Sequence, residues 1–217
     1  MLENTFFPRT IYSFAFVMLV TVLLAYIQST IVITDEIRID MFLIQGYSEE
    51  MATSFLEKTK QYTWLGYCIS IFFLIIGIFF TSLCIKIGFF ISDKNVGYSD
   101  VLKAVVVGQI VWFIPSLIQI FWFYFIQTTY SFEDIQSFYS FTLVDIIDKN
   151  DSTYSYFLGF LSIFGLYGLL YCVTISLVLS SLQDNSWSKY FLVVLLSYIS
   201  GSMIVQLFLT FLTIIYS

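Results

Sequence analysis

Residues 63–87 read TWLGYCISIFFLIIGIFFTSLCIKI, and this stretch decides the class of fold. It contains no charged side chain before Lys86. A helix rises about 1.5 Å per residue, so roughly 20 mostly apolar residues cross the hydrocarbon core of a bilayer. Residues 63–87 are therefore predicted to form a transmembrane helix.

Four further segments on either side of it have the same apolar character. Each is long enough to cross a bilayer and is bounded by charged or turn-forming sequence. They cover residues 10–34, 103–128, 154–181 and 190–216. We predict an all-α polytopic membrane protein, a bundle of about five transmembrane helices. Residues 1–217 are predicted to form a single membrane domain.

The composition fits a membrane protein and excludes several functions. Of the 217 residues, 59% are hydrophobic and 11% are charged, whereas about a quarter of a soluble domain is charged. A net charge of −6 disfavours a nucleic-acid partner. Histidine is absent, which removes imidazole-based metal sites and Ser-His-Asp triads. The cysteines show no CxxC spacing and are interpreted as buried packing residues, namely Cys68, Cys84 and Cys172. We expect no enzymatic activity, no cofactor and no metal.

The polar residues inside the predicted helices are neutral. Asp and Glu are missing from the middle of every predicted span, which disfavours an ion-coupled pathway. Gln109 and Gln119 lie in the third span and Gln206 in the fifth. Gly108 and Pro115 also lie in the third span, where the proline is predicted to kink the helix. The glutamines either bond neighbouring helices, each at about 1 kcal/mol, or line a cavity for a lipid or small solute.

Small residues form a strip on the fourth predicted span. Gly165 follows Ser162 by three positions, and Gly168 follows Gly165 by three, with Gly159 one turn earlier. Small side chains let another helix approach closely. That helix could belong to this chain or to a partner. A similar patch in the fifth span contains Ser197, Ser200, Gly201 and Ser202.

The polar segment 35–62, between the first two spans, contains apolar residues at helical spacing. They are Tyr47, Met51, Phe55 and Leu56. This pattern predicts a short extramembrane amphipathic helix. It either rests on the membrane surface or the bundle, or docks a partner.

Charge placement predicts the orientation. With the N-terminus in the cytoplasm, five of the nine Lys and Arg residues lie inside, in line with the positive-inside rule. The outer loops are then the longer ones and hold eleven of the fifteen acids. We predict a cytoplasmic N-terminus and an external C-terminus.

Two regions resemble a known family. The run VGYSDVLK at 96–103, leading to IPSL at 114–117, is similar to the third-span entry of the Yip family of multi-pass membrane proteins. Residues 161–179 and the connection NSWSK at 185–189 are similar to its last two spans. The likeness, strongest to bacterial members, covers most of residues 60–215. It implies a protein of a bacterial inner membrane, with no established catalysis, that is a partner of envelope transport machinery.

Two functions remain open. The first is a non-catalytic membrane subunit that scaffolds or regulates an envelope-transport or trafficking complex, with membrane lipids and other integral membrane subunits or a second copy as partners. The alternative is a small transporter or lipid-handling protein with a neutral polar pathway around Gln109, Pro115 and Gln119. A membrane enzyme is disfavoured, because it would depend on Asp93, Asp100 or the cysteines near the interface.

Overall fold

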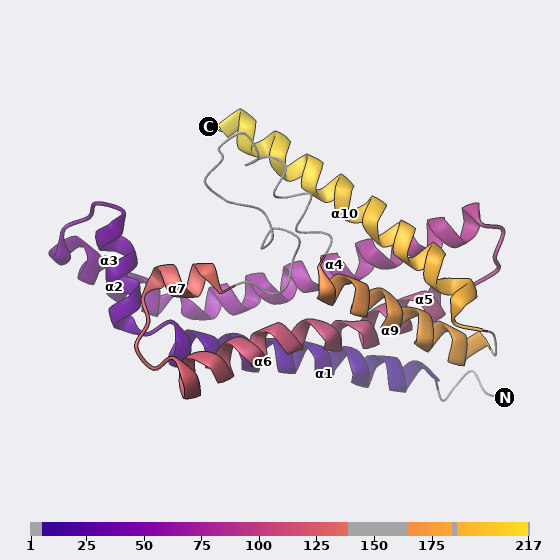
Figure 1. Cartoon of the computed structure of the whole chain (residues 1–217), viewed down its shortest axis with the longest axis horizontal. Coiled ribbons are helices and arrows are strands. Elements are labelled where there is room, and N and C mark those ends of the chain that lie inside the picture. Colours follow the sequence, from indigo (N-terminus) through magenta and orange to yellow (C-terminus); the bar gives the residue numbers. More distant parts are fainter. Residues whose placement is uncertain (1–5, 139–164, 184–185, 217) are drawn as a thin grey trace. The chain divides into compact units, whose positions relative to one another are not determined.

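A computed structural model describes residues 6–138, 165–183 and 186–216, and the elements in these ranges are helices, with no strand (Figure 1). Five helices are long and apolar enough to cross a membrane: Ile11–Val32, Thr63–Ile91, Tyr98–Ile126, Leu166–Gln183 and Ser188–Thr213. The all-α class and the multi-pass character are therefore confirmed. The third span begins earlier than predicted, and residues 154–164 of the predicted fourth span lie outside the described ranges.

Several of these spans are composed of more than one helical element. The first consists of α1 and a π-helical turn, η2, and the third consists of α5, the 3-10 turn η3, α6 and the π-helical turn η4. Their bounds are α1 Phe6–Ile27, η2 Gln28–Val32, α4 Thr63–Ile91, α5 Tyr98–Gly108, η3 Gln109–Trp112, α6 Phe113–Phe121, η4 Trp122–Ile126, α9 Leu166–Gln183 and α10 Ser188–Tyr216.

The chain divides into two compact units. The first comprises 76–112 with the described parts of 1–13 and 139–217, and the second comprises 14–75 and 113–138. Helix α4 contributes to both units, because the division falls between residues 75 and 76. The single domain expected over residues 1–217 stays a prediction.

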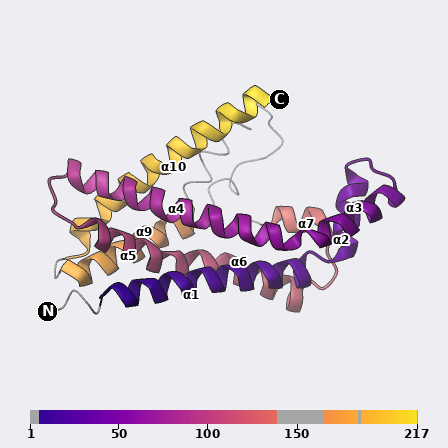
Figure 2. The same ribbon diagram turned by 180° about the vertical axis from the view of Figure 1, so that it is seen from behind.

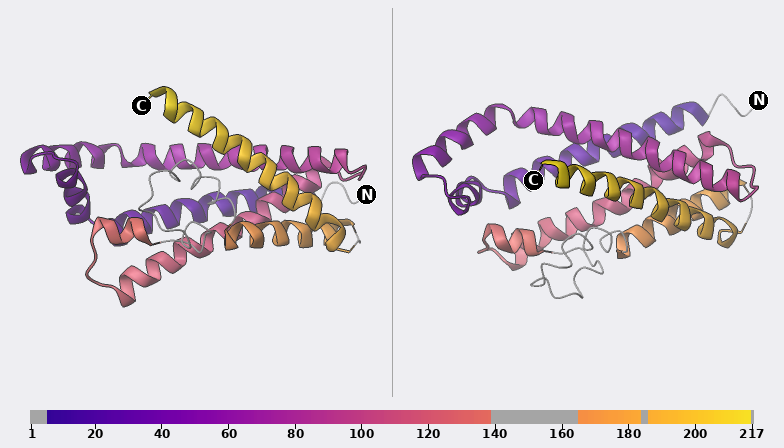
Figure 3. Two further views of the ribbon diagram at one scale, coloured as in Figure 1. Left: turned by 45° about the horizontal axis from the view of Figure 1, so that its top comes forward. Right: turned by 90° about the horizontal axis from the view of Figure 1, so that it is seen from above.

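In the first unit, α9 packs between α5 and α10 (Figures 1 and 3). The buried residues of α5 include Val101, Ala104, Val105 and Gly108, which follow the i, i+3, i+4, i+7 spacing of one helix face. Without water to exclude, such a contact is stabilised mainly by close van der Waals packing.

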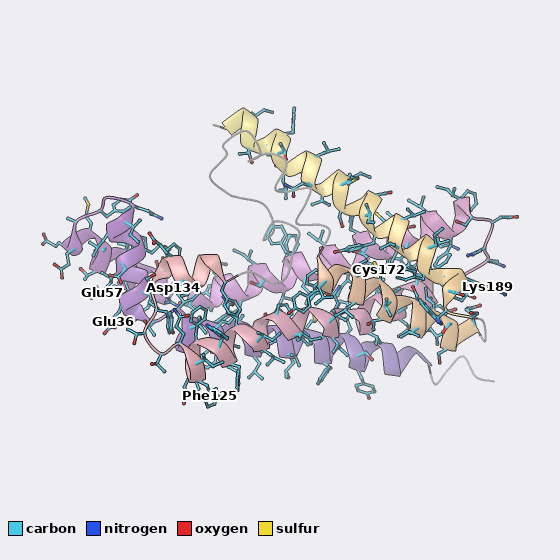
Figure 4. All side chains as sticks on the ribbon, in the orientation of Figure 1. Glu36, Glu57, Phe125, Asp134, Cys172 and Lys189 are labelled. Atoms are coloured by element: carbon cyan, nitrogen blue, oxygen red, sulfur yellow. The ribbon has the colours of Figure 1, made fainter. Side chains whose placement is uncertain are left out.

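The cysteines differ from one another in burial. Cys172 of α9 is buried (labelled in Figure 4), Cys84 is half-buried and Cys68 is exposed. Because a thiol packs only where a neighbouring helix covers it, the packing interpretation is wrong for Cys68, whose side of α4 is uncovered by described residues.

In the second unit, the segment between the first two spans folds into two helices, α2 Asp35–Ile44 and α3 Glu49–Gln61 (Figure 2). Gly46, at φ +87°, turns the chain between them, and the ring of Phe42 meets those of Tyr47 and Phe55 at 6.2 and 5.8 Å. Tyr47 precedes α3 and is not part of its helical face, although its ring still meets that of Phe55 on α3 at 5.4 Å.

Helix α7, Phe132–Ser137, begins with a capping box. The Ser131 hydroxyl accepts from the Asp134 backbone N–H at 3.3 Å, and the Asp134 carboxylate accepts from the Ser131 backbone N–H at 2.7 Å. The bonds from Ser131, first from its backbone and then from its hydroxyl, lower the pKa of Asp134 below its ordinary value. The first turn of a helix has backbone N–H groups without intrahelical acceptors, and the Asp134 carboxylate accepts from one of them, the N–H of Ser131.

The cap is expected to weaken only in acid. Because the pKa of Asp134 is lowered on folding, its contribution is complete above the unfolded pKa, about 3.9, and is lost as pH falls through the lower folded value. The Ser131 amide resonance, followed by NMR in detergent micelles, should titrate with a midpoint below that ordinary value. Asp134→Asn should abolish the titration. A midpoint at or above the ordinary value would contradict the capping geometry.

Candidate helix-packing site

Gly108 and Gln109 lie where α5 gives way to η3, against α9. A Cβ atom built on Gly108 would lie 2.8 Å from the Tyr171 ring and 3.0 Å from the Ile175 side chain. The Gln109 amide donates to the Tyr171 hydroxyl at 3.1 Å. The glycine therefore permits a close approach of two helices, and the neighbouring amide joins them by a hydrogen bond.

Tyr171 is the centre of this contact, although the sequence analysis did not select it. The side chain is 1% exposed, and its ring lies 6.0 Å from that of Trp112 and 5.5 Å from that of Tyr198. A tyrosine hydroxyl that is buried within an apolar span needs a hydrogen-bond partner. The presence of a tyrosine in the fourth span is the sequence signal that could have indicated Tyr171.

The third span changes its hydrogen-bonding pattern just before Pro115. Proline has no N–H, so the carbonyl of Val111, four residues earlier, has no α-helical donor at position 115. Residues Gln109–Trp112 form the 3-10 turn η3, and α6 begins at Phe113. This irregular turn lies on the N-terminal side of Pro115, where the donor is missing, and the kink predicted at Pro115 stays a prediction.

In the second unit, Gln119 of α6 accepts a hydrogen bond from the Gln28 amide of η2 at 2.8 Å.

The carbonyls at the end of the first span are bonded by side chains from other elements. Helical C-termini leave carbonyls without intrahelical donors. Arg38 Nη2 donates to the Ser29 carbonyl at 2.9 Å, and the Tyr130 hydroxyl lies 3.1 Å from the carbonyl oxygens of Ile31 and Val32. Partial burial raises the pKa of Tyr130, so its hydroxyl stays protonated and can donate.

The remaining predicted residues are scattered. Gly165 and Gly168 are buried at the start of α9. Gly159 and Ser162 lie outside the described residues. Gln206 is half-buried on α10. The proposed strip on the fourth span is therefore only partly described.

Two other close approaches in the first unit involve single glycines. A Cβ atom on Gly88 of α4 would lie 3.1 Å from the Ser197 Cβ atom, and one on Gly201 of α10 would lie 2.9 Å from the Cys84 sulfur. Ser197 and Gly201 belong to the small-residue patch predicted in the fifth span. Gly88 had no distinguishing signal, because an isolated glycine in an apolar run looks the same whether or not a helix covers it.

Charged groups gather at the α4–α5 end of the first unit. The Asp100 carboxylate accepts from Gln183 at 2.9 Å and from Lys103 at 3.3 Å, and Lys86 Nζ donates to the Val96 carbonyl at 2.6 Å. Asp100 therefore fastens α5 to the end of α9. In the described ranges, no three His, Cys, Asp or Glu residues are grouped so that they could hold a metal ion.

The five apolar helices define a multi-pass membrane protein, and two of its intramembrane glutamines, Gln109 and Gln119, join helices of the chain. Comparisons with family models, with curated proteins and with solved structures find no match.

Proposed function

We propose that the chain is a non-catalytic integral membrane subunit that packs against other membrane proteins and scaffolds or regulates an envelope-transport or trafficking complex. The observation that carries the proposal is Gln206, whose amide makes no hydrogen bond with any described residue. An amide on a membrane helix gains by bonding a polar group of another helix. Gln109 and Gln119 have such partners within the chain, whereas Gln206 has none among the described residues.

The surroundings of Gln206 support a contact with another protein. Ile204, Leu207 and Phe208 are each about 60% exposed around it, so no described helix covers this part of α10. Thr210 and Thr213 follow Gln206 by four and seven positions and therefore share its face. We define these three residues as the α10 polar strip, and we propose that it meets a partner helix.

The proposal includes an orientation and a setting. It places the N-terminus in the cytoplasm and the C-terminus outside a bacterial inner membrane, in keeping with the Lys and Arg distribution and the resemblance to the Yip family. It treats α3 as an amphipathic helix that lies at the membrane surface, with the exposed side chains of Met51 and Phe55 among the lipid headgroups.

The engagement of two glutamines favours this function over a neutral transport pathway. A pathway needs polar groups that are available to a moving solute. Gln109 is bonded to Tyr171, and Gln119 is bonded to Gln28. Each side-chain amide is therefore engaged by another helix of the chain through one hydrogen bond.

The test is co-purification of the tagged full-length protein from its host in mild detergent, followed by mass spectrometry. We expect a stoichiometric integral membrane partner or a second copy. Gln206→Leu should reduce its recovery about fivefold, as the loss of about 1 kcal/mol implies. Gln119→Leu removes the same group from inside the chain and should leave recovery unchanged. A parent protein that elutes as a monomer without any membrane partner would contradict the proposal.

A further inference from the structure

The turn between the first two membrane helices holds an open groove of about 500 Å³, within the second unit. It is walled by α1 at Ala25, by α2 at Arg38, and by the end of α3 with the start of α4 over residues 58–70. Thr63, Gly66 and Ser70 line it at spacings of three and four, so one face of α4 forms its floor. The volume falls in the range of small-ligand sites, about 300–1,000 Å³.

The charged groups that line the groove are cations. Arg38 and Lys58 line it, and no carboxylate does so among the described residues. Lys60, the third cation of the segment, does not line the groove and pairs with Asp35 at 2.5 Å. The acids Glu36 and Glu57 lie on the same two helices, exposed and outside the lining (Figure 4). The groove is thus cationic within a segment that is acidic as a whole.

Both cations keep hydrogen-bonding capacity. Arg38 donates one hydrogen bond to the Ser29 carbonyl, and a guanidinium has five N–H donors. Lys58 makes no ion pair within the described part of the chain. An arginine and a lysine that line one groove without an acidic residue in its described lining suit a phosphate, which accepts charge-assisted bonds from both.

The groove also lies at the boundary of the membrane. Thr63 is the first residue of the second membrane helix, and Ala25 lies within the first. Arg38 and Lys58 lie in the polar segment that joins these helices. The part of the groove lined by Arg38 and Lys58 is therefore at the level of the lipid headgroups. The small residues Ala25 and Gly66 leave space along the apolar part of the helices.

We propose that this groove binds an anionic phospholipid, with Arg38 and Lys58 holding the phosphate and an acyl chain lying between the α1 wall at Ala25 and the α4 floor at Gly66. Charge complementarity identifies the headgroup class, because basic sites beside membrane helices favour anionic over zwitterionic lipids. The site does not depend on the subunit function proposed above, since it uses none of the α10 polar strip.

Gly66 provides the sharpest test. A Cβ atom there meets no atom within 4 Å, so the leucine of Gly66→Leu enters the open groove rather than the protein. Gly77 on the same helix is also open and lies outside the groove, which makes Gly77→Leu a matched control. Native mass spectrometry of the full-length protein in detergent, titrated with phosphatidylglycerol or phosphatidylcholine, should show that the parent prefers phosphatidylglycerol. Gly66→Leu should weaken its binding about tenfold or more, about 1.4 kcal/mol, and Gly77→Leu should not.

The charge variants test the headgroup contact. Arg38→Gln combined with Lys58→Gln should abolish the preference for phosphatidylglycerol, whereas Lys60→Gln, which removes a nearby cation outside the groove, should retain it. Inorganic phosphate should fail to displace the lipid at equal concentration. Equal binding of the two lipids by the parent, parental binding by Gly66→Leu, or displacement by phosphate alone would each overturn the proposal.

Discussion

Gly108→Ala is expected to destabilise the first unit by about 1–3 kcal/mol, the usual effect of overpacking a close contact. The added methyl group would lie 2.8 Å from the Tyr171 ring and 3.0 Å from Ile175. Neither neighbour can move away easily, because both residues are buried, at 1% and 0% exposed. The ring is also held on two sides by Trp112 and Tyr198. The helices α5 and α9 would have to separate to admit the methyl group.

The measurement is an SDS titration of the purified protein in mixed micelles, followed by circular dichroism, which gives the free energy of unfolding. Gly77→Ala is the matched variant, since its Cβ atom meets no atom within 4 Å. It should be neutral or slightly stabilising, because alanine favours a helix more than glycine does. Gly108→Leu should be worse than Gly108→Ala. If both alanine variants unfold alike, α5 and α9 do not approach as closely as described.

The sequence determined the locations of the membrane helices because hydropathy is a local property. Residues 63–87 needed no partner to be recognised, and the structure has a helix there from Thr63 to Ile91. The disturbance near Pro115 was also local, since a missing N–H affects a known carbonyl. The prediction missed that the span is disturbed upstream, at residues 109–112.

Pairing of helices was not predictable in the same way. Gln109 needed a partner, but nothing in its neighbourhood indicated Tyr171, which lies 62 residues away. Gly77, Gly88 and Gly108 all occur in apolar runs, yet only the last two lie against other side chains. Which face of a membrane helix meets another depends on the whole assembly, because lipid tails are as apolar as the packed side chains.

The segment between the first two spans illustrates the same limit. Helical spacing predicted one helix around residues 47–56, whereas the structure has two, α2 before Gly46 and α3 after it. That turn brings Arg38 of α2 and Lys58 of α3 to one groove, although they are twenty positions apart in sequence. A charge count over the segment gave only an acidic total, and it could not reveal the local cationic site.

Tyr171→Ala is expected to cost about 3–5 kcal/mol, the range for deleting a large aromatic side chain from a packed core. The ring fills the space between Trp112 and Tyr198 and lies against Gly108, whose lack of a side chain leaves nothing to replace it. Partial collapse is limited because the neighbours of the ring belong to three different helical elements, η3 for Trp112, α10 for Tyr198 and α5 for Gly108.

Tyr171→Phe tests the contribution of the hydroxyl separately from that of the ring. It keeps the packing and removes the bond from Gln109 together with the hydroxyl's side-chain hydrogen bond with Thr81, so it should cost at least about 1 kcal/mol. In a double-mutant cycle, Gln109→Leu and Tyr171→Phe should then be non-additive, because each removes the same hydrogen bond. Additive effects would show that the two groups do not interact. A loss of less than about 1 kcal/mol for Tyr171→Ala would show that aromatic packing does not hold α9 in place. A large loss confined to the alanine variant would instead establish that ring packing, rather than the polar bond, stabilises the contact among these helices.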